Sequence, residues 1–211
     1  MNFNTAFLSI ILMLIMPSEI LFSQQSSGIL KDIDGNEYPT VQIGNQVWMA
    51  KNLKVTKSPD GTTVNAYAPQ DDESKVETFG RLYPWVIVKT VCPYGWHTPS
   101  AGEWDALIEF LGGPMIAGGK IKDTGTTHWR DPNKGATNET GFTALPVGYR
   151  TRNGKYMNFK NNLAYFWSSS ESTDDPTTAW GYYITYGEPI IYKYSYSFTK
   201  DMSMSVRCIK D

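Results

Sequence analysis

Histidine and cysteine are scarce in this chain, and that scarcity limits its chemistry. Among its 211 residues these two types are represented only by His97, His128, Cys92 and Cys208. With two histidines and no His-Glu-x-x-His arrangement, a catalytic zinc site lacks ligands. The chain also has no Gly-x-Ser-x-Gly elbow and no glycine-rich phosphate loop. We therefore expect no enzyme activity, no metal and no cofactor.

Charge of either sign is also in short supply. Lysine and arginine total 19 and aspartate and glutamate total 21, which gives a formal net charge of −2, and no basic run occurs. Domains that bind nucleic acid carry a basic footprint, and segments that bind membrane surfaces carry clustered lysine or arginine. The composition therefore argues against nucleic acid and membrane surfaces as partners.

No hydrophobic run is long enough to cross a bilayer. The longest covers residues 7–16 and ends at Pro17, whereas a membrane helix needs about 20 apolar residues. We interpret residues 1–23 as a signal peptide, although the segment before the run has no lysine or arginine. An uncleaved membrane anchor is the alternative. Cleavage predicts an exported protein, periplasmic, cell-surface or secreted, with no stable membrane insertion.

Cleavage leaves residues 24–211, which suffice for one domain with a sizeable core. Residues 24–31 are mostly small or polar and are predicted to form a linker, so the domain covers residues 32–211. Aromatic residues make up 14% of the chain, with 7 Trp and 13 Tyr. So many rings can fill a core and can also face a ligand.

The two cysteines are expected to form a disulfide bond, because cysteines of exported proteins usually pair. Cys92 lies in a loop before a predicted helix and Cys208 lies near the end of the chain, so the bond would close most of the domain. A Cys92 nucleophile assisted by His97 is the alternative, and oxidation to a disulfide would remove it. His97 is expected to have a hydrogen-bonded structural role.

The main helix is predicted to begin at a capping box. Ser100 is followed three residues later by Glu103, the spacing at which hydroxyl and carboxylate each cap a backbone N–H group. The helix covers residues 101–111 and stops at Gly112-Gly113. Its apolar face consists of Trp104, Leu107, Ile108 and Leu111.

Alternation of apolar and polar residues predicts antiparallel strands. Gly44-Asn45 is a two-residue hairpin turn between the first two of them. A shorter helix is predicted over residues 114–122, interrupted at Gly118-Gly119. The class is α+β, with a twisted antiparallel sheet, one main helix, one short helix and long loops. The predicted strands cover residues 38–43, 46–50, 165–170, 180–184 and 192–198, followed by a last strand whose inward face is Met204, Val206 and Cys208.

Residues 32–36, Asp-Ile-Asp-Gly-Asn, predict a tight turn, because Asx side chains bond their own backbone and Gly35 accepts a positive φ. The start of an EF-hand calcium loop is the alternative. That loop needs glycine at its sixth position and a later glutamate, and neither is present, so we favour the turn.

The loop over residues 123–140 is the predicted ligand surface. It has no recognisable helix or strand, and long structureless loops inside a compact domain are often functional. His128, Trp129 and Arg130 stand in its middle, where a ring could stack on a sugar and the polar groups could bond its hydroxyls. The alternative is that Trp129 anchors the loop to the core. Exposure of Trp129 favours binding, whereas burial favours anchoring.

Several motifs resemble a known family, the Fibrobacter succinogenes major paralogous domain of exported proteins from Bacteroidetes and Fibrobacter. The resemblance covers residues 32–211 in the family's order and implies a C-type-lectin-like fold in which the first and last strands pair and a disulfide ties the helix region to the last strand. It implies no biochemical activity. The similar motifs lie at residues 47–53, 80–83, 92–104, 141–146, 148–150, 166–169 and 205–208.

Two functions of related folds do not carry over. Calcium-dependent lectins of this fold use an acidic-Pro-Asn loop and a Trp-Asn-Asp motif, but Ile190 follows Glu188-Pro189 here and no Trp-Asn-Asp occurs. Formylglycine-generating enzymes need a reactive cysteine pair in a copper-binding site. Here Cys92 and Cys208 lie far apart in the sequence and are expected to form a disulfide, so that chemistry is not expected. The predicted function is therefore a non-catalytic binding module for an extracellular glycan or protein. The alternatives are a structural or surface-assembly component and, less favoured, an enzyme.

Overall fold

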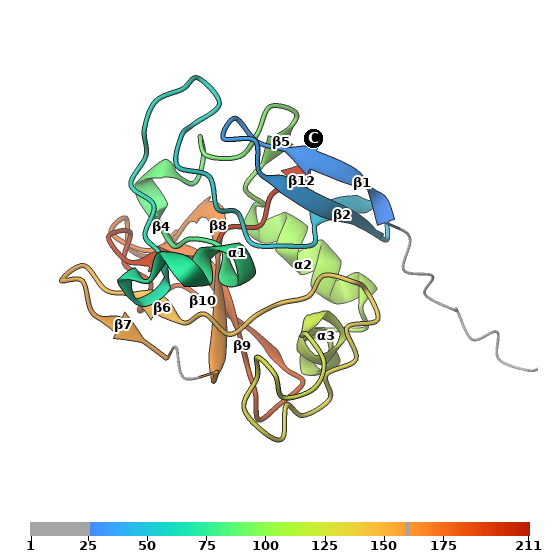
Figure 1. Cartoon of the computed structure of the whole chain (residues 1–211). Coiled ribbons are helices and arrows are strands. Elements are labelled where there is room, and N and C mark those ends of the chain that lie inside the picture. Colours follow the sequence, from blue (N-terminus) through green and yellow to red (C-terminus); the bar gives the residue numbers. More distant parts are fainter. Residues whose placement is uncertain (1–25, 159–160) are drawn as a thin grey trace, which may run out of the picture.

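Three antiparallel sheets, a few short helices and long loops form the fold in residues 26–158 and 161–211, the part of the chain that this computed structural model describes (Figure 1). The first sheet has the strand order β1-β2-β3-β12-β5. Its last strand in sequence, β12, lies between β3 and β5, because Ile209 pairs with Trp48 on one side and with His97 on the other. The bounds are β1 Ser26–Lys31, β2 Glu37–Ile43, β3 Gln46–Met49, β5 Trp96–His97 and β12 Ile209–Lys210.

Two smaller sheets complete the strand framework, with the orders β10-β9-β8 and β4-β11-β6-β7. All the strand pairs in the three sheets are antiparallel. The bounds are β4 Tyr83–Pro84, β6 Tyr149–Arg150, β7 Tyr156–Met157, β8 Leu163–Glu171, β9 Ala179–Thr185, β10 Ile191–Tyr194 and β11 Ser203–Met204.

The main helix, α2 (Ala101–Phe110), begins as predicted. The Ser100 hydroxyl accepts from the Glu103 N–H at 3.2 Å, and the Ser100 N–H donates to the Glu103 carboxylate at 2.7 Å, which completes the capping box. The other helices are α1 Val76–Phe79, α3 Pro114–Ile121 and the short 3₁₀ helices Pro69–Asp71, Glu73–Lys75 and Trp85–Ile87.

Helix α3 runs through Gly118-Gly119, where an interruption was predicted. The two glycines allow close packing. A Cβ atom on Gly118 would lie 2.5 Å from the backbone oxygen of Ile190, and one on Gly119 would lie 2.3 Å from that of Gly135. These positions therefore need glycine for the contact they make and not as helix breakers.

Two aromatic clusters form the core. In the first, the Trp104 ring stacks on Tyr182 with centroids 4.9 Å apart and lies 5.0 Å from Trp48. In the second, the Trp167 indole N–H donates to the Tyr83 carbonyl at 2.9 Å. Trp48 lies in the first cluster, and Met49, the next residue of β3, lies in the second. In β8, Phe166 and Trp167 divide between the clusters in the same way. Both faces of these two strands are therefore buried at these residues.

The predicted disulfide between Cys92 and Cys208 is present, with an S–S distance of 2.08 Å and a sequence separation of 116 residues. The predicted inward residues Met204, Val206 and Cys208 are all buried. The residues between them, Ser205 and Arg207, are buried as well, so this stretch has no solvent-facing side. The predicted single last strand is instead divided into β11 and β12, with residues 205–208 between them.

Arg207 lies in that intervening segment and is completely buried. Its guanidinium donates to the Asn52 side-chain oxygen at 2.6 Å, to the Met49 carbonyl at 3.0 Å and to the carbonyls of Phe142 and Thr143. Burial lowers the pKa of Arg207 to about 9. The cation thus joins three chain segments through neutral acceptors.

Residues 24–31 were predicted to be a linker, but residues 26–31 form strand β1. Leu30 pairs with Tyr38 and Lys31 with Glu37. The small polar side chains misled the prediction, because an edge strand is held by backbone hydrogen bonds and needs few apolar side chains.

The strand predicted over residues 192–198 ends early. Strand β10 pairs with β9 only as far as Tyr194 opposite Gly181. The chain then leaves the ladder, Tyr196 is 84% exposed, and Phe198 returns to the core. A Cβ atom on Gly181 would lie 2.7 Å from the Phe198 ring, so this ring fills the space that Gly181 leaves.

The broad α+β class agrees with the structure, although the single predicted sheet is replaced by three sheets with few, short helices. Within the described residues, no helix is long and apolar enough to cross a membrane. The predicted signal peptide, residues 1–23, lies outside the described residues.

Candidate functional site

The predicted ligand surface at residues 128–130 does not form one surface. His128 is partly exposed, and its Nδ1 lies 2.7 Å from the Asp123 carboxylate while its ring meets the edge of Phe79. Arg130 is exposed, with its guanidinium carbon 5.1 Å from the centre of the Tyr186 ring. The neighbouring side chains therefore have different partners.

Trp129 is buried, with 1% of its surface exposed. Its indole N–H donates to the Ala144 carbonyl at 3.0 Å, which satisfies the one polar group of the ring. The ring cannot stack on a sugar in this position. The anchoring alternative is therefore the one the structure supports, and the prediction of Trp129 as a binding residue is wrong.

A second anchor of the same loop is the buried side chain of Lys122. Its ammonium donates to three backbone carbonyls, those of Lys134, Thr185 and Glu188, at 2.9–3.0 Å. Burial lowers the pKa of this lysine to about 8. The contacts join the loop to the turn between β9 and β10, at the bottom of the molecule in Figure 1.

The aromatic ring that does face solvent beside a hollow belongs to Tyr94, which is 79% exposed. Its turn is fixed on both sides. The Trp96 N–H donates to the Pro93 carbonyl at 3.0 Å, and the Asp211 N–H donates to the Gly95 carbonyl at 3.1 Å. The disulfide at Cys92 holds the start of the turn. We call residues 92–96 the Tyr94 turn.

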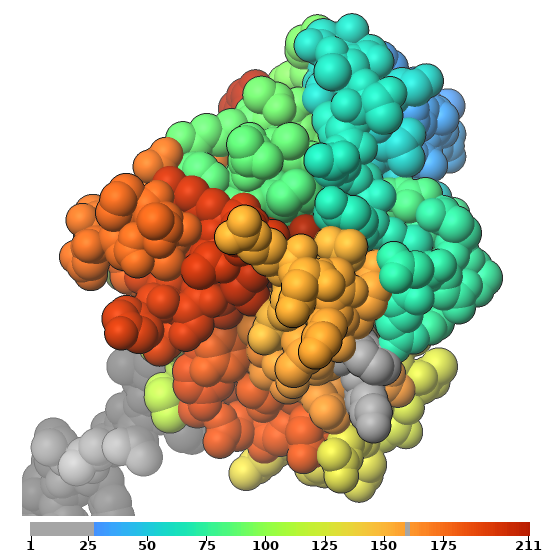
Figure 2. Space-filling model, turned by 90° about the vertical axis from the view of Figure 1, so that its left-hand side faces the viewer, coloured from blue at the N-terminus to red at the C-terminus, as the bar shows by residue number. Residues whose placement is uncertain are grey.

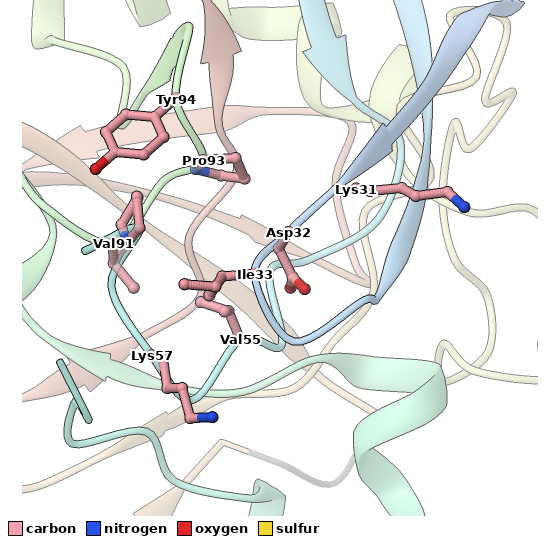
Figure 3. Close-up of a pocket in the computed structure, with 9 residues that line it drawn as sticks. Lys31, Asp32, Ile33, Val55, Lys57, Val91, Pro93 and Tyr94 are labelled. Carbon is pink, nitrogen blue, oxygen red and sulfur yellow. The ribbon is translucent and has the colours of Figure 1, made fainter. Parts of the chain in front are cut away.

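A first hollow of about 370 Å³ lies beside this turn (Figure 3). In Figure 3, Tyr94 and Lys57 lie toward opposite ends of the hollow, with side chains of other segments between them, and Lys31 points away. Lys57 lies 4.0 Å from the Asp34 carboxylate. The apolar part of the lining is Ile33, Val55, Pro59, Val91, Pro93 and Tyr94.

Asp32 also lines the first hollow, but its carboxylate is occupied. It accepts from the backbone N–H groups of Asp34 at 3.0 Å and Asn36 at 2.9 Å, and from the Tyr38 hydroxyl at 2.6 Å. The tight turn predicted over residues 32–36 is thereby confirmed. Among the described residues, no group of three or more His, Cys, Asp or Glu could hold a metal ion.

A second hollow of about 370 Å³ is lined by all five residues of the Tyr94 turn. The two hollows share Pro59, Pro93 and Tyr94. Figure 2 shows the segments that carry these residues, around 55–65 and 85–96, side by side at the top of one face. The polar side of the second hollow consists of Ser58, Asp60, Lys89, Thr90 and Asp211, with Trp96 beside them.

A larger hollow, about 500 Å³, lies between α2, the start of α3 and β10. Its rim carries Asp105 and Lys193, which pair with each other at 2.6 Å. The Tyr182 hydroxyl also donates to Asp105 at 2.9 Å. Glu109 also lines this hollow and is exposed. The hollow therefore offers a ligand apolar contact and one further carboxylate.

His97 occupies the position between two carboxylates. Its Nδ1 lies 2.6 Å from Asp211 and its Nε2 lies 2.8 Å from Glu103. Partial burial works against protonation, but the hydrogen bonds to Asp211 and Glu103 outweigh it and raise the pKa of His97. The predicted hydrogen-bonded role of this histidine is confirmed, and both of its nitrogens are in use.

The sequence analysis did not select Tyr94, because its stretch was explained by the cysteine and the capping box. One signal was available. Tyr94 stands between Pro93 and Gly95, and Gly95 has a φ of 77°, so the ring projects from a tight turn that leaves it little protein to pack against. An aromatic residue at such a tip is expected to be exposed.

Comparison with protein-family models matches residues 41–210 to the Fibrobacter succinogenes major domain. The matched range contains both cysteines, α2 and the Tyr94 turn. No curated protein and no solved structure matches the chain.

Proposed function

The chain belongs to the Fibrobacter succinogenes major domain family, and from that premise we propose that it is an exported, non-catalytic module that binds an extracellular glycan at the Tyr94 turn. The observation that carries the proposal is the 79% exposure of Tyr94 between two hollows. A tyrosine ring offers an apolar face to a sugar ring and a hydroxyl to its polar groups.

The rigidity of the turn supports this proposal. The disulfide, the Pro93–Trp96 turn and the Asp211–Gly95 hydrogen bond hold the backbone on both sides of Tyr94. A ring presented by a fixed backbone loses little conformational entropy when a ligand binds, and so more of the contact energy appears as affinity.

The non-catalytic part of the proposal rests on groups that are already engaged. The two cysteine sulfurs are bonded to each other, so neither offers a thiolate. Both ring nitrogens of His97 contact carboxylates, and Nδ1 of His128 contacts Asp123. These contacts favour structural roles for the residues that the sequence offered as nucleophile or base.

We also propose that the fold is C-type-lectin-like. Three features support this, namely the last strand β12 in the same sheet as the first strand β1, the disulfide from the loop before α2 to the chain before β12, and the long loops outside the sheets. The expected direct pairing of the first and last strands is not observed, because β12 pairs with β3 and β5. An experimental structure compared with C-type lectins tests the assignment. A different strand connectivity would contradict it.

Export is proposed from the predicted signal peptide, and the disulfide supports it because such bonds persist in oxidising compartments. The test is mass spectrometry of the protein purified from fractionated cells. We expect a mature chain that starts near Gln24, outside the cytoplasm. Full-length protein in the cytoplasmic fraction would contradict export.

Glycan binding is tested with a glycan array and titration calorimetry on wild type, Tyr94→Ala and a control, Tyr196→Ala. Tyr196 is a suitable control because it is 84% exposed but lines neither hollow. Loss of stacking of about 1 kcal/mol lowers affinity about fivefold in Tyr94→Ala, whereas Tyr196→Ala binds like wild type. Absence of binding by wild type would favour the structural or surface-assembly alternative.

A further inference from the structure

The two hollows beside Tyr94 are parts of one surface. Pro59, Pro93 and Tyr94 line both of them, so the hollows meet at the Tyr94 turn. Each has a volume of about 370 Å³, within the range of about 300–1,000 Å³ that small-ligand sites have. A ligand that fills both must have two connected parts that pass over the same ring.

The chemistry of the hollows differs in a way that suits two successive sugar rings. The first hollow has an apolar floor that includes Val55 and Val91, and an apolar floor accepts the C–H face of a sugar. The second carries the hydroxyl of Thr90 and the carboxylate of Asp60, which can bond sugar hydroxyls. The Asp60 carboxylate accepts the Thr62 N–H at 2.9 Å through one oxygen and so retains acceptor capacity for a ligand.

The lysines that line the hollows are each paired with a carboxylate, whereas the lining carboxylates of Asp32 and Asp60 have no cation beside them within the described residues. An anionic ligand therefore meets no unpaired cation among these side chains, which favours a neutral one. A charged ligand would compete with these contacts and would have to be stripped of water as well. The pairs are Lys31–Glu37 at 2.8 Å, Lys57–Asp34 at 4.0 Å, Lys89–Glu171 at 3.7 Å and His97–Asp211 at 2.6 Å.

From these observations we infer that the ligand is a neutral glycan of at least two linked sugar rings, which crosses Tyr94 and places one ring in each hollow. The inference rests on the proposed function, since it names the size and charge of the glycan bound at that site. The Tyr94 ring lies under the linkage or under one of the two rings, and each hollow acts as a separate subsite.

The test uses two variants at exposed positions, one for each hollow. Ile33→Ser changes the apolar hollow at a residue that is 48% exposed. Asp60→Ala changes the polar hollow, and Asp60→Asn controls for loss of the contact to Thr62. The probes are mono-, di- and trisaccharides of β-1,4-linked glucose, mannose and N-acetylglucosamine, measured by calorimetry after thermal unfolding has confirmed that each variant folds.

We expect the disaccharide of the bound series to bind at least about tenfold more tightly than its monosaccharide, with little further gain for the trisaccharide. Both variants weaken disaccharide binding at least about threefold. A monosaccharide can occupy only one hollow, so only the variant changed in that hollow should weaken monosaccharide binding. This pattern requires two occupied subsites.

Two outcomes would overturn the inference while glycan binding at Tyr94 stands. One is equal affinity for mono- and disaccharide. The other is weaker disaccharide binding in only one of the two variants, Ile33→Ser or Asp60→Ala. Preference for a sulfated or carboxylated sugar, or for a peptide over every glycan, would overturn it too. If no sugar of any length binds, the proposed function fails, and the inference fails with it.

Discussion

The 123–140 loop and the Tyr94 turn both carry an aromatic ring outside the strands, and the two rings face opposite ways. Trp129 is 1% exposed and bonds to Ala144, whereas Tyr94 is 79% exposed at the tip of a braced turn. The longer segment uses its ring to stay attached to the core. The Tyr94 turn is held by the disulfide and backbone hydrogen bonds, so the Tyr94 ring remains exposed to solvent.

This comparison shows that loop length and side-chain type do not by themselves indicate a binding surface. An eighteen-residue segment without ladder hydrogen bonds needs other contacts to remain ordered, and here buried side chains such as Trp129 and Lys122 supply them. A five-residue turn closed by a disulfide and two backbone hydrogen bonds does not need its side chain for that purpose.

Removal of the anchoring ring is the strongest test of this difference. Trp129→Ala leaves a large cavity and removes the indole hydrogen bond to the Ala144 carbonyl, which still accepts from the Asp123 N–H at 3.1 Å. The cavity term dominates, and the free energy of unfolding should fall by about 3–5 kcal/mol. Urea denaturation measures it. The matched control Arg130→Ala, at an exposed neighbour, should change stability by less than about 0.5 kcal/mol. Similar losses in both variants would mean that Trp129 does not hold the loop.

Loss of the disulfide affects the Tyr94 turn, because Cys92 holds the start of that turn. The double variant Cys92→Ala, Cys208→Ala opens a link across 116 residues and should lower the free energy of unfolding by about 2–5 kcal/mol. Because the bond also braces the Tyr94 turn, glycan affinity of the folded fraction should fall. Unchanged affinity would show that the two backbone hydrogen bonds hold the turn by themselves.

The Lys122 anchor predicts a rise of stability with pH. Burial lowers the pKa of Lys122 to about 8, from 10.5 for an unperturbed lysine, so between these values the unfolded chain binds more protons than the folded one. Stability therefore increases with pH across this window, by about 2 kcal/mol from pH 7 to about 9.5. Urea denaturation at the two pH values should show the increase in wild type but not in Lys122→Met. An equal increase in both would assign it to other groups.

The smallest effect on stability is expected at the exposed ring. Tyr94→Ala should change the free energy of unfolding by less than about 0.5 kcal/mol, because the side chain buries little surface. The same urea experiment measures it. A loss of more than about 1 kcal/mol would mean that Tyr94 supports the fold and would weaken its assignment to a ligand.

Local signals in the sequence predicted the elements whose causes are local. The capping box at Ser100 and Glu103 located α2, and Gly44-Asn45 located the β2–β3 hairpin. The cysteine count predicted the disulfide. The helix start and the hairpin depend on residues close in sequence. The disulfide joins distant residues, but the chain has only two cysteines, so their pairing could be predicted.

Predictions failed where a distant partner decides the outcome. The alternation of residues 192–198 continues past Tyr194, but the strand stops because Phe198 packs over Gly181 instead of continuing the ladder. The candidate surface at Trp129 failed for the same kind of reason, since Ala144 takes its indole N–H. Alternation of apolar and polar residues predicts which side chains share a face of a segment. It does not predict which distant residues that face will contact.

The interior position of β12 in the first sheet, between β3 and β5, has a kinetic consequence. The hairpin β2–β3 cannot complete its sheet until β12 arrives, and the bond from Arg207 to Met49 links residues 158 positions apart. Such non-local contacts slow folding, because a long loop must close before they form. The growing polypeptide therefore carries an unfinished sheet, with the β3 edge open, until β12 is synthesised.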